Sequence, residues 1–440
     1  MRLTEVFTRC DALAPLIESA CATDDAQSFI SSVQSMPPNA ALARVVRASA
    51  NDFADAAGIA RPVMSDDGPI AFAGQQPYVD YYPAVPVKLD ALAACGGASF
   101  YAFADYAPLG SDPWMSRTEL PSVAAVDGVL RLAFVRSSRA WEGRDLRFVP
   151  PPDSAQLQLI EAKLKGMITD AARHATFAKS DAYAHLRELM AGYEEARTRA
   201  HSLGAFSAIA SARLFQRLGF TLPFVSLSDL LGREELLPLI ADTLAIFIRE
   251  RALIAEAVDE AMAFDDRGEL HFTRKESDHV PLAIAGAEDG IRRAVRLVMK
   301  GDDHLLVAGG ETFNAGHADA ASLVALLQQL RGRWSLDVFA PLFLFRLGVA
   351  GIVNGRGSIR YSLVLGHVMQ RLFGERHPPN LLCSTAPPPS GPLIEAVCHA
   401  RGGLLPALRD YEPTLIDRFL TSNAATIREE IRVAWRNGAA

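Results

Sequence analysis

Apolar and polar positions alternate between strand and helix patterns along the chain, most clearly from residue 68 to residue 114. An apolar run at 69–73 predicts a strand, and a helical spacing of apolar positions predicts a helix at 85–95. A second apolar run at 98–104 predicts another strand. A loop at 74–77 joins the first strand to the helix. This order of strand, helix and second strand is that of a right-handed parallel crossover. A parallel sheet is therefore predicted at the centre of the protein.

The remaining patterns divide the chain into four segments. Residues 1–65 predict a helical N-terminal segment, and residues 66–153 predict the first part of a Rossmann-like core with some antiparallel strands. Residues 154–212 contain no proline and predict an inserted helical hairpin or short coiled coil. Residues 213–440 predict the second part of the core, ending in helices. We expect an α/β fold, a Rossmann-like parallel sheet with helices on both faces.

Composition and charge narrow the class of protein. With 440 residues, of which 50% are hydrophobic, the chain can form a large core and two to three structural units. The chain has 44 basic and 51 acidic residues, and the basic residues do not cluster in a block. This composition argues against a nucleic-acid partner. The N-terminus does not have the pattern of a signal peptide, and the longest apolar run, 338–353, is too short to span a bilayer. We expect a soluble cytoplasmic protein without a membrane partner, with a homodimer as one option.

Cysteine and histidine spacing supports no metal or disulfide framework. The five cysteines are scattered and never form C-x-x-C, which argues against structural disulfides and a zinc knuckle. The ten histidines include no pair at i, i+4, so spacing alone does not support a histidine metal site. His279 and His317 lie in polar loops and are the two worth testing, although each is also typical of a surface histidine.

Three glycine-containing loops, at 74–77, 309–317 and 354–360, each follow a predicted strand and lead towards a predicted helix. Free N–H groups and the helix dipole suit a phosphate or carboxylate in such a loop. None of the loops matches a named phosphate-binding motif, and each alone can be a simple turn. Three in one chain favour an anion site at one of them. Gln75 and Gln76, in the first loop, can orient a ligand but do not titrate near neutral pH.

Four charged residues near these loops are candidates for chemistry. Lys88, on the helix after the first loop, could reach an anion bound there. Arg356 and Arg360, in the third loop, could bind a phosphate or carboxylate through paired N–H donors. Asp105, at the end of the second strand, could bind a ribose hydroxyl, an amine, or a metal through water. The alternative is a solvated residue for the three cations and a helix or turn cap for Asp105.

Two phrases of the sequence resemble one known family. Residues 69–93, PIAFAGQQPYVDYYPAVPVKLDALA, resemble the first strand, loop and helix of the bacillithiol-biosynthesis cysteine-adding enzymes and of related uncharacterised bacterial proteins. Residues 345–374, FRLGVAGIVNGRGSIRYSLVLGHVMQRLFG, resemble the F-I-H-G-I-G-G-x-K-Y-D segment of those uncharacterised proteins. The resemblance extends over about residues 66–385. It implies a nucleotidyltransferase-like Rossmann fold.

The resemblance also implies a site and an activity. The matching positions are Gly74, Gln75, Gln76, Pro83 and Lys88 in the first phrase, and Asn354, Gly355, Gly357, Arg360 and Tyr361 in the second. With Arg356, they would bind a nucleotide or a phosphorylated sugar, an anionic small-molecule ligand. The protein would be a ligase or transferase acting on a small amine-bearing metabolite, with a nucleotide and magnesium as cofactor. Lys88 and Asp105 would be catalytic, by neutralising phosphate charge and by orienting the acceptor or a ribose.

Several ionisable groups of the family phrases are replaced in this chain. Gln75 stands where one version of the first phrase has histidine, Asn354 replaces the histidine of the second phrase, and Ser362 replaces its aspartate. Only Asp105 remains of an acidic segment after the second strand. Because proton transfer needs such groups, a second hypothesis is a non-catalytic family member that binds a ligand or serves as a scaffold. The third is an α/β protein whose glycine loops are only turns.

Overall fold

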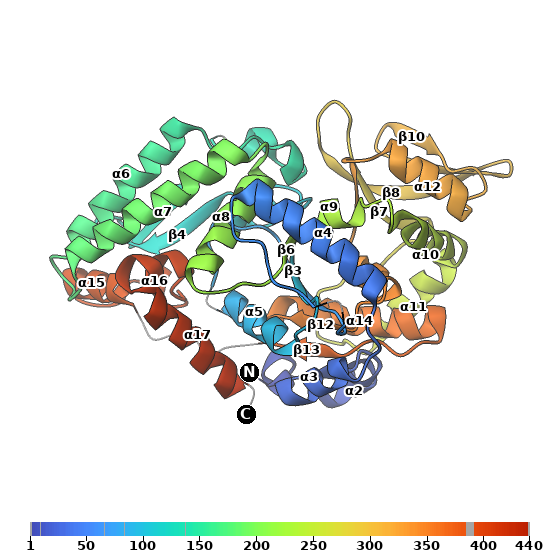
Figure 1. Ribbon diagram of the computed structural model, residues 1–440, viewed down its shortest axis with the longest axis horizontal. Helices are drawn as coiled ribbons and strands as arrows, with labels where there is room; N and C mark the ends of the chain where they lie inside the picture. The colour runs from blue at the N-terminus through green and yellow to red at the C-terminus, as the bar shows by residue number, and fades with distance from the viewer. Residues whose placement is uncertain are drawn as a thin grey trace.

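The computed structural model describes residues 2–8, 10–65, 67–82, 84–136, 138–383 and 391–438, so Pro83 lies outside the described residues. Its centre is a six-stranded, fully parallel sheet in the order β1-β13-β12-β2-β3-β6 (Figure 1). The strands are β1 (Ala22–Thr23), β2 (Ala71–Gln75), β3 (Phe100–Phe103), β6 (Phe224–Ser226), β12 (Gly351–Asn354) and β13 (Asn380–Leu382). The predicted α/β class and Rossmann-like parallel sheet are confirmed.

The direction in which strands are added reverses at β2. From β2 the chain passes through α5 (Ala84–Cys95) to β3 and later to β6, and it then returns to the other side of β2 as β12, followed by β13. Gly351 of β12 pairs in parallel with Ala71 of β2. The carboxyl ends of β2 and β12 are therefore neighbours at a topological switch point, where open α/β sheets bind their ligands.

Helices cover both faces of this sheet. Phe72 packs in one core cluster with residues of α4 (Ala40–Ala57) and α14 (Arg356–Phe373). Ala73, the next residue of β2, packs in the other cluster with residues of α5 and α8 (Leu203–Arg217). Successive residues of a strand point to opposite faces, so β2 must be apolar on both sides. This double burial explains why the strand reads as a continuous apolar run.

Helical segments surround the sheet at both ends of the chain and in its middle. Near the N-terminus are α1 (Leu3–Val6), α2 (Cys10–Ser19) and α3 (Ala26–Gln34), and β1 adds an edge strand parallel to β13. The segment predicted as a helical hairpin forms α6 (Ser154–Ala171) and α7 (Lys179–Arg199), which lie side by side at the upper left of Figure 1, and leads into α8. Asp153 starts α6 by accepting a hydrogen bond from the backbone N–H of Gln156.

A five-stranded antiparallel sheet, which the sequence patterns did not predict, lies beside the core in the order β10-β9-β8-β7-β11. Its strands are β7 (His279–Ala285), β8 (Arg292–Lys300), β9 (Asp303–Ala308), β10 (Glu311–Asn314) and β11 (Trp334–Leu336). The strand and the helix predicted on either side of 309–317 are β9 and α12 (Ala320–Gln329), but the segment between them contains β10 and is not simply a loop. Ala308 pairs with Glu311, so Gly309 and Gly310 are the turn of a β-hairpin, and Gly309 has a φ of 62°.

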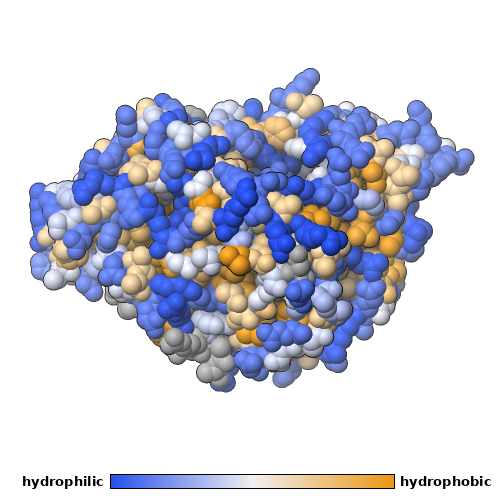
Figure 2. Space-filling model, in the orientation of Figure 1, coloured by the Kyte–Doolittle hydropathy of each residue, from blue (hydrophilic) through white to orange (hydrophobic). Residues whose placement is uncertain are grey.

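The other elements connect these layers. They are β4 (Arg117–Pro121), β5 (Val129–Ala133), α9 (Leu227–Leu231), α10 (Leu237–Arg249), α11 (Arg251–Ala263), α12 (Ala320–Gln329), α13 (Ala340–Arg346), α15 (Pro392–Arg401), α16 (Leu415–Thr421) and α17 (Ala424–Gly438). The apolar run at 338–353 supplies α13 and β12. In the described part of the chain, no helix has the length and apolar character needed to cross a membrane. On the face drawn in Figure 2, polar residues dominate and apolar ones gather in small groups.

Candidate functional site

The carboxyl end of β2 presents two amide side chains. Gln75 is the last residue of the strand, and its backbone position pairs with Phe103 of β3. Its Nε2 donates to Oε1 of Gln76 over 3.1 Å and to the hydroxyl of Tyr78 over 3.3 Å. Its Oε1, on the other side of the amide, accepts a hydrogen bond from Lys88. The predicted loop at 74–77 is thus partly strand, and its polar groups are held in a defined orientation.

Lys88 lies one turn into α5 and meets Gln75 at this edge. Its side chain is 3% exposed, and its Nζ donates to Oε1 of Gln75 over 3.3 Å. Among the described residues, no carboxylate forms an ion pair with it. Burial lowers the pKa of Lys88 to about 8, because desolvation penalises the charged form. At pH 7 the group is therefore a protonated, buried ammonium whose hydrogen-bond partner is an amide.

The backbone at the start of α14 passes directly over this lysine. Gly355 is the N-cap of α14, and a Cβ added to it would lie 3.3 Å from Cε and 3.5 Å from Nζ of Lys88. A side chain at position 355 would therefore crowd the ammonium group. The first N–H groups of α14 and the positive end of its dipole add to the positive potential of Lys88.

Asn354, the last residue of β12, joins three elements below this point. It is 2% exposed, and its Nδ2 donates to Oγ of Ser362 over 3.1 Å and to Oδ1 of Asn380 over 2.6 Å. Its backbone carbonyl accepts from the N–H of Cys383 over 2.7 Å. These contacts tie β12 to α14 and β13. The related phrases have ionisable groups at positions 354 and 362. In this protein, Asn354 and Ser362 instead form a neutral, buried network.

Tyr78 and Asp112 extend the polar network from Gln75. The Tyr78 hydroxyl donates to Oδ2 of Asp112 over 2.6 Å. Burial, followed by the hydrogen bond to Asp112, raises the pKa of Tyr78 far above its usual value. The sequence patterns select neither Tyr78 nor Asp112 as a candidate. The available signal was a tyrosine two residues after a pair of glutamines at a strand end.

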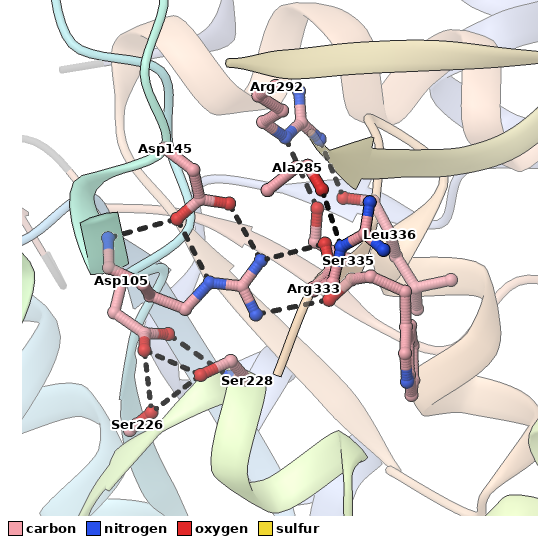
Figure 3. Close-up of polar contacts among 11 residues, drawn as sticks. Asp105, Asp145, Ser226, Ser228, Ala285, Arg292, Arg333, Ser335 and Leu336 are labelled. Atoms are coloured by element: carbon pink, nitrogen blue, oxygen red, sulfur yellow. Dashed lines mark hydrogen bonds and ion pairs between the residues drawn. The ribbon is translucent and has the colours of Figure 1, made fainter. Parts of the chain in front are cut away.

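Asp105 lies just after β3 and has structural partners (Figure 3). Its Oδ2 accepts from the hydroxyls of Ser226, over 2.9 Å, and Ser228, over 2.6 Å, while its Oδ1 accepts from the N–H of Ser228 over 3.1 Å. None of these bonds involves Lys88 or Gln75. The carboxylate fixes the end of β6 and the start of α9, which is the capping role raised as the alternative in the sequence.

A buried ion pair lies beside Asp105 and connects the two sheets (Figure 3). Arg147 donates from Nε and Nη2 to the two carboxylate oxygens of Asp145 over 2.9 and 2.7 Å. Its Nη1 donates to the carbonyl of Trp334 in β11 over 3.1 Å. Arg292 of β8 donates to Oγ of Ser335, also in β11, over 3.2 Å. These contacts hold the antiparallel sheet against the region that follows β3.

The cations of the third loop do not gather around Lys88. Arg356 and Gly357 are exposed in the first turn of α14. Arg360 donates from Nη1 to the carbonyl of Glu269 over 2.5 Å and from Nη2 to the carbonyl of Val6 over 2.9 Å. Its guanidinium therefore anchors the N-terminal segment.

The candidate residues thus fall into two groups. Tyr361 packs against the core, and burial raises its pKa to about 12. Tyr361, Arg360 and Asp105 form the first group, in which the contacts of each side chain hold parts of the fold together. The residues that lie together at the switch point are Gly74, Gln75, Gln76, Lys88, Asn354 and Gly355.

A surface hollow of about 560 Å³ lies elsewhere, at the far end of α14. Its lining includes Pro15, Glu18, Gln370 and Arg376, and none of the candidate residues. α14 has 18 residues, so its two ends are about 27 Å apart. We place the candidate site by its chemistry, at the buried lysine, because nothing comparable lines the hollow.

The described residues do not form a protein-held magnesium site. They include no group of three or more histidine, cysteine, aspartate or glutamate side chains arranged to hold a metal ion. Asp112 is a carboxylate near Gln75, and Tyr78 already occupies one of its oxygens. Magnesium usually binds through one or two carboxylates together with phosphate oxygens. We therefore derive no chemical step through this ion.

Comparison with known proteins adds no relative. A scan against models of protein families matched none of them to this chain, and a search of curated proteins also found no match. The geometry of the switch point and the two phrases of the sequence are therefore what point to a function.

Proposed function

We propose that this protein binds a phosphorylated small molecule, a nucleotide or a phosphorylated sugar, at the carboxyl edge of β2 and β12. The observation that carries this proposal is Lys88, an ammonium group that is 3% exposed and hydrogen bonded to an amide rather than paired with a carboxylate. A buried charge without a counter-charge is costly. A bound anion would supply that charge at the place where open α/β sheets bind ligands.

The surroundings of Lys88 suit a phosphate group. Gly355 leaves the ammonium unobstructed by a Cβ, and the start of α14 offers free backbone N–H groups. The amides of Gln75 and Gln76 can orient a sugar or a base beside the phosphate. Arg356, exposed in the first turn of α14, can add a second positive charge from the solvent side.

We further propose that the protein is a ligase or transferase for a small amine-bearing metabolite, as its resemblance to the cysteine-adding enzymes implies. Lys88 would neutralise charge on the phosphate, since its pKa of about 8 keeps it protonated at pH 7. Asp105 would support the neighbouring strand end rather than contact the acceptor. Catalysis would then depend on positioning and electrostatic stabilisation.

A second candidate is a non-catalytic protein that binds the same ligand. The neutral network of Asn354, Ser362 and Asn380 favours it, because three buried positions at the switch point hold no group that titrates near neutral pH. Both candidates share the anion site and differ in turnover.

A thermal-shift panel of nucleotides, sugar phosphates and inorganic phosphate tests the anion site. A ligand at about one hundred times its Kd should stabilise the wild type by about 2.7 kcal/mol. Lys88→Met should abolish that shift. Without ligand, the variant should be at least as stable as the wild type, because methionine removes the buried charge at similar volume.

The matched control is Lys163→Met, which changes an exposed lysine of α6 and should retain the ligand shift. The site is disproved if no phosphorylated compound stabilises the wild type, or if Lys88→Met keeps the full shift. Release of phosphate or diphosphate from a bound nucleotide in the presence of amines then separates the two candidates. Turnover supports the enzyme, and binding without turnover supports the non-catalytic protein.

A further inference from the structure

Two histidines that are distant in sequence meet outside the switch point. His174 lies in the turn that follows α6, and His399 lies in the last turn of α15. The two residues are 225 positions apart, yet their Nδ1 atoms are separated by 3.4 Å. Their ring centroids are 5.6 Å apart, with an angle of 45° between the planes. The proposed ligand site uses neither residue.

The separation of the two nitrogens fits a shared metal ion. Hydrogen bonds from N–H groups in proteins usually span about 2.7–3.2 Å, so 3.4 Å is long for a direct bond. Two imidazole nitrogens about 2.0–2.1 Å from one tetrahedral zinc ion are about 3.3–3.4 Å apart. The observed distance therefore matches the separation of two ligands of one ion.

The supporting elements fix the backbone at both histidines and leave the pair open to solvent. The backbone N–H of His174 donates to the carbonyl of Ala171 over 2.9 Å, which fixes the turn after α6. α15 buries Leu393 and Val397 against its neighbours, while His399 is exposed and His174 half-buried. An ion can therefore enter from solvent, and water can complete its coordination.

We propose that the Nδ1 atoms of His174 and His399 form a binding site for a Zn²⁺ ion or another transition-metal ion that prefers imidazole, such as Ni²⁺ or Cu²⁺. The described residues place no third metal-holding side chain in a cluster with them, so the protein supplies two ligands. Glu395, exposed one turn before His399 on the same helix, adds negative charge nearby. The ion would cross-link α6 to α15.

Calorimetric titration of the metal-free full chain with Zn²⁺ tests this site. We expect one ion to bind per chain, and Co²⁺ to give the absorption of a histidine-ligated ion. His174→Ala and His399→Ala should each lower the affinity about tenfold or more, because each removes one of the two protein ligands. Zn²⁺ should raise the Tm of the wild type and not that of either variant.

The matched control is His317→Ala, which changes an exposed histidine in the turn before α12 and should leave Zn²⁺ binding unchanged. Both test positions are at the surface and outside the core clusters, so circular dichroism should show folded variants. The proposal is overturned if the wild type does not bind Zn²⁺, or if either single variant keeps the wild-type affinity.

Discussion

At the scale of single residues, Lys88 differs from the other buried cation in the described part of the chain. Arg418, which is 7% exposed, forms an ion pair with Glu430. Arg147, almost as buried, pairs with Asp145. Buried charges are normally paired because desolvation is costly. Lys88 breaks this pattern at a topological switch point, and this exception supports the proposed anion site more strongly than its position on a helix does.

Two buried acids give the folded state a pH dependence. Burial raises the pKa of Asp80 to about 6 and that of Asp417 to about 7. The native state then binds more protons than the unfolded chain, whose aspartates titrate near about 3.9. The stability that these two acids contribute should be fully present below about pH 4 and should be lost as the pH rises through the two native pKa values.

Asp417→Asn tests this dependence. In urea titrations, the free energy of unfolding of the wild type should fall between pH 5 and pH 8. This fall should be smaller in the variant by more than about 1 kcal/mol, since each unit of pKa shift corresponds to about 1.4 kcal/mol. The control is Asp242→Asn, which changes an exposed residue of α10 and should keep the wild-type dependence. Equal dependence in wild type and Asp417→Asn would refute the assignment.

The sequence could predict which residues belong to the switch point better than it could predict their environments. Gln75, Gln76 and Lys88 follow a strand end, so local order in the chain is enough to select them. The burial of Lys88 and the partners of Arg360 depend on contacts with distant segments. Arg360, for example, binds a carbonyl 354 residues away, that of Val6. No periodic pattern contains such information.

At the scale of elements, local patterns predicted the parallel crossover but missed the antiparallel sheet. β2, α5 and β3 follow one another within about 35 residues, and each has a clear period. The sequence around Gly309-Gly310 predicts a loop before a helix, whereas in the structure these two glycines form the hairpin turn between β9 and β10. Two glycines between apolar runs are equally typical of a hairpin. β11 joins β7 across about 50 residues, a pairing that no local pattern indicates.

Asp105→Ala tests the capping role between β3 and α9. The variant loses three hydrogen bonds and leaves the groups of Ser226 and Ser228 without this acceptor. We expect a loss of about 1–3 kcal/mol in the free energy of unfolding, measured by urea titration. Asp105→Asn keeps one carbonyl oxygen and should lose less. Both variants should retain the ligand shift, and a stable Asp105→Ala variant without that shift would instead show contact with the ligand.

At the scale of the whole molecule, the two sheets share one apolar core cluster, which includes Phe72 of β2 and Val280 of β7, and polar contacts also join them. Arg147 connects the segment after β5 to β11, and the N–H of Asp145 donates to the carbonyl of Gly290, just before β8, over 3.0 Å. In Figure 1, β7, β8 and β10 lie together at the upper right, beside α10 and away from α6 and α7. The Arg147–Asp145 pair therefore adds a polar connection to the apolar packing that positions the antiparallel sheet.

Arg147→Met should weaken this connection because it leaves Asp145, which is fully buried, without its cation. Removing one partner of a buried ion pair typically costs about 3–5 kcal/mol. We expect a lower midpoint of urea unfolding and faster hydrogen exchange at residues 279–336 than in the rest of the protein. The double variant Arg147→Met/Asp145→Leu removes the unpaired charge and should recover part of the loss. If hydrogen exchange at residues 279–336 is as slow in Arg147→Met as in the wild type, apolar packing alone positions the antiparallel sheet.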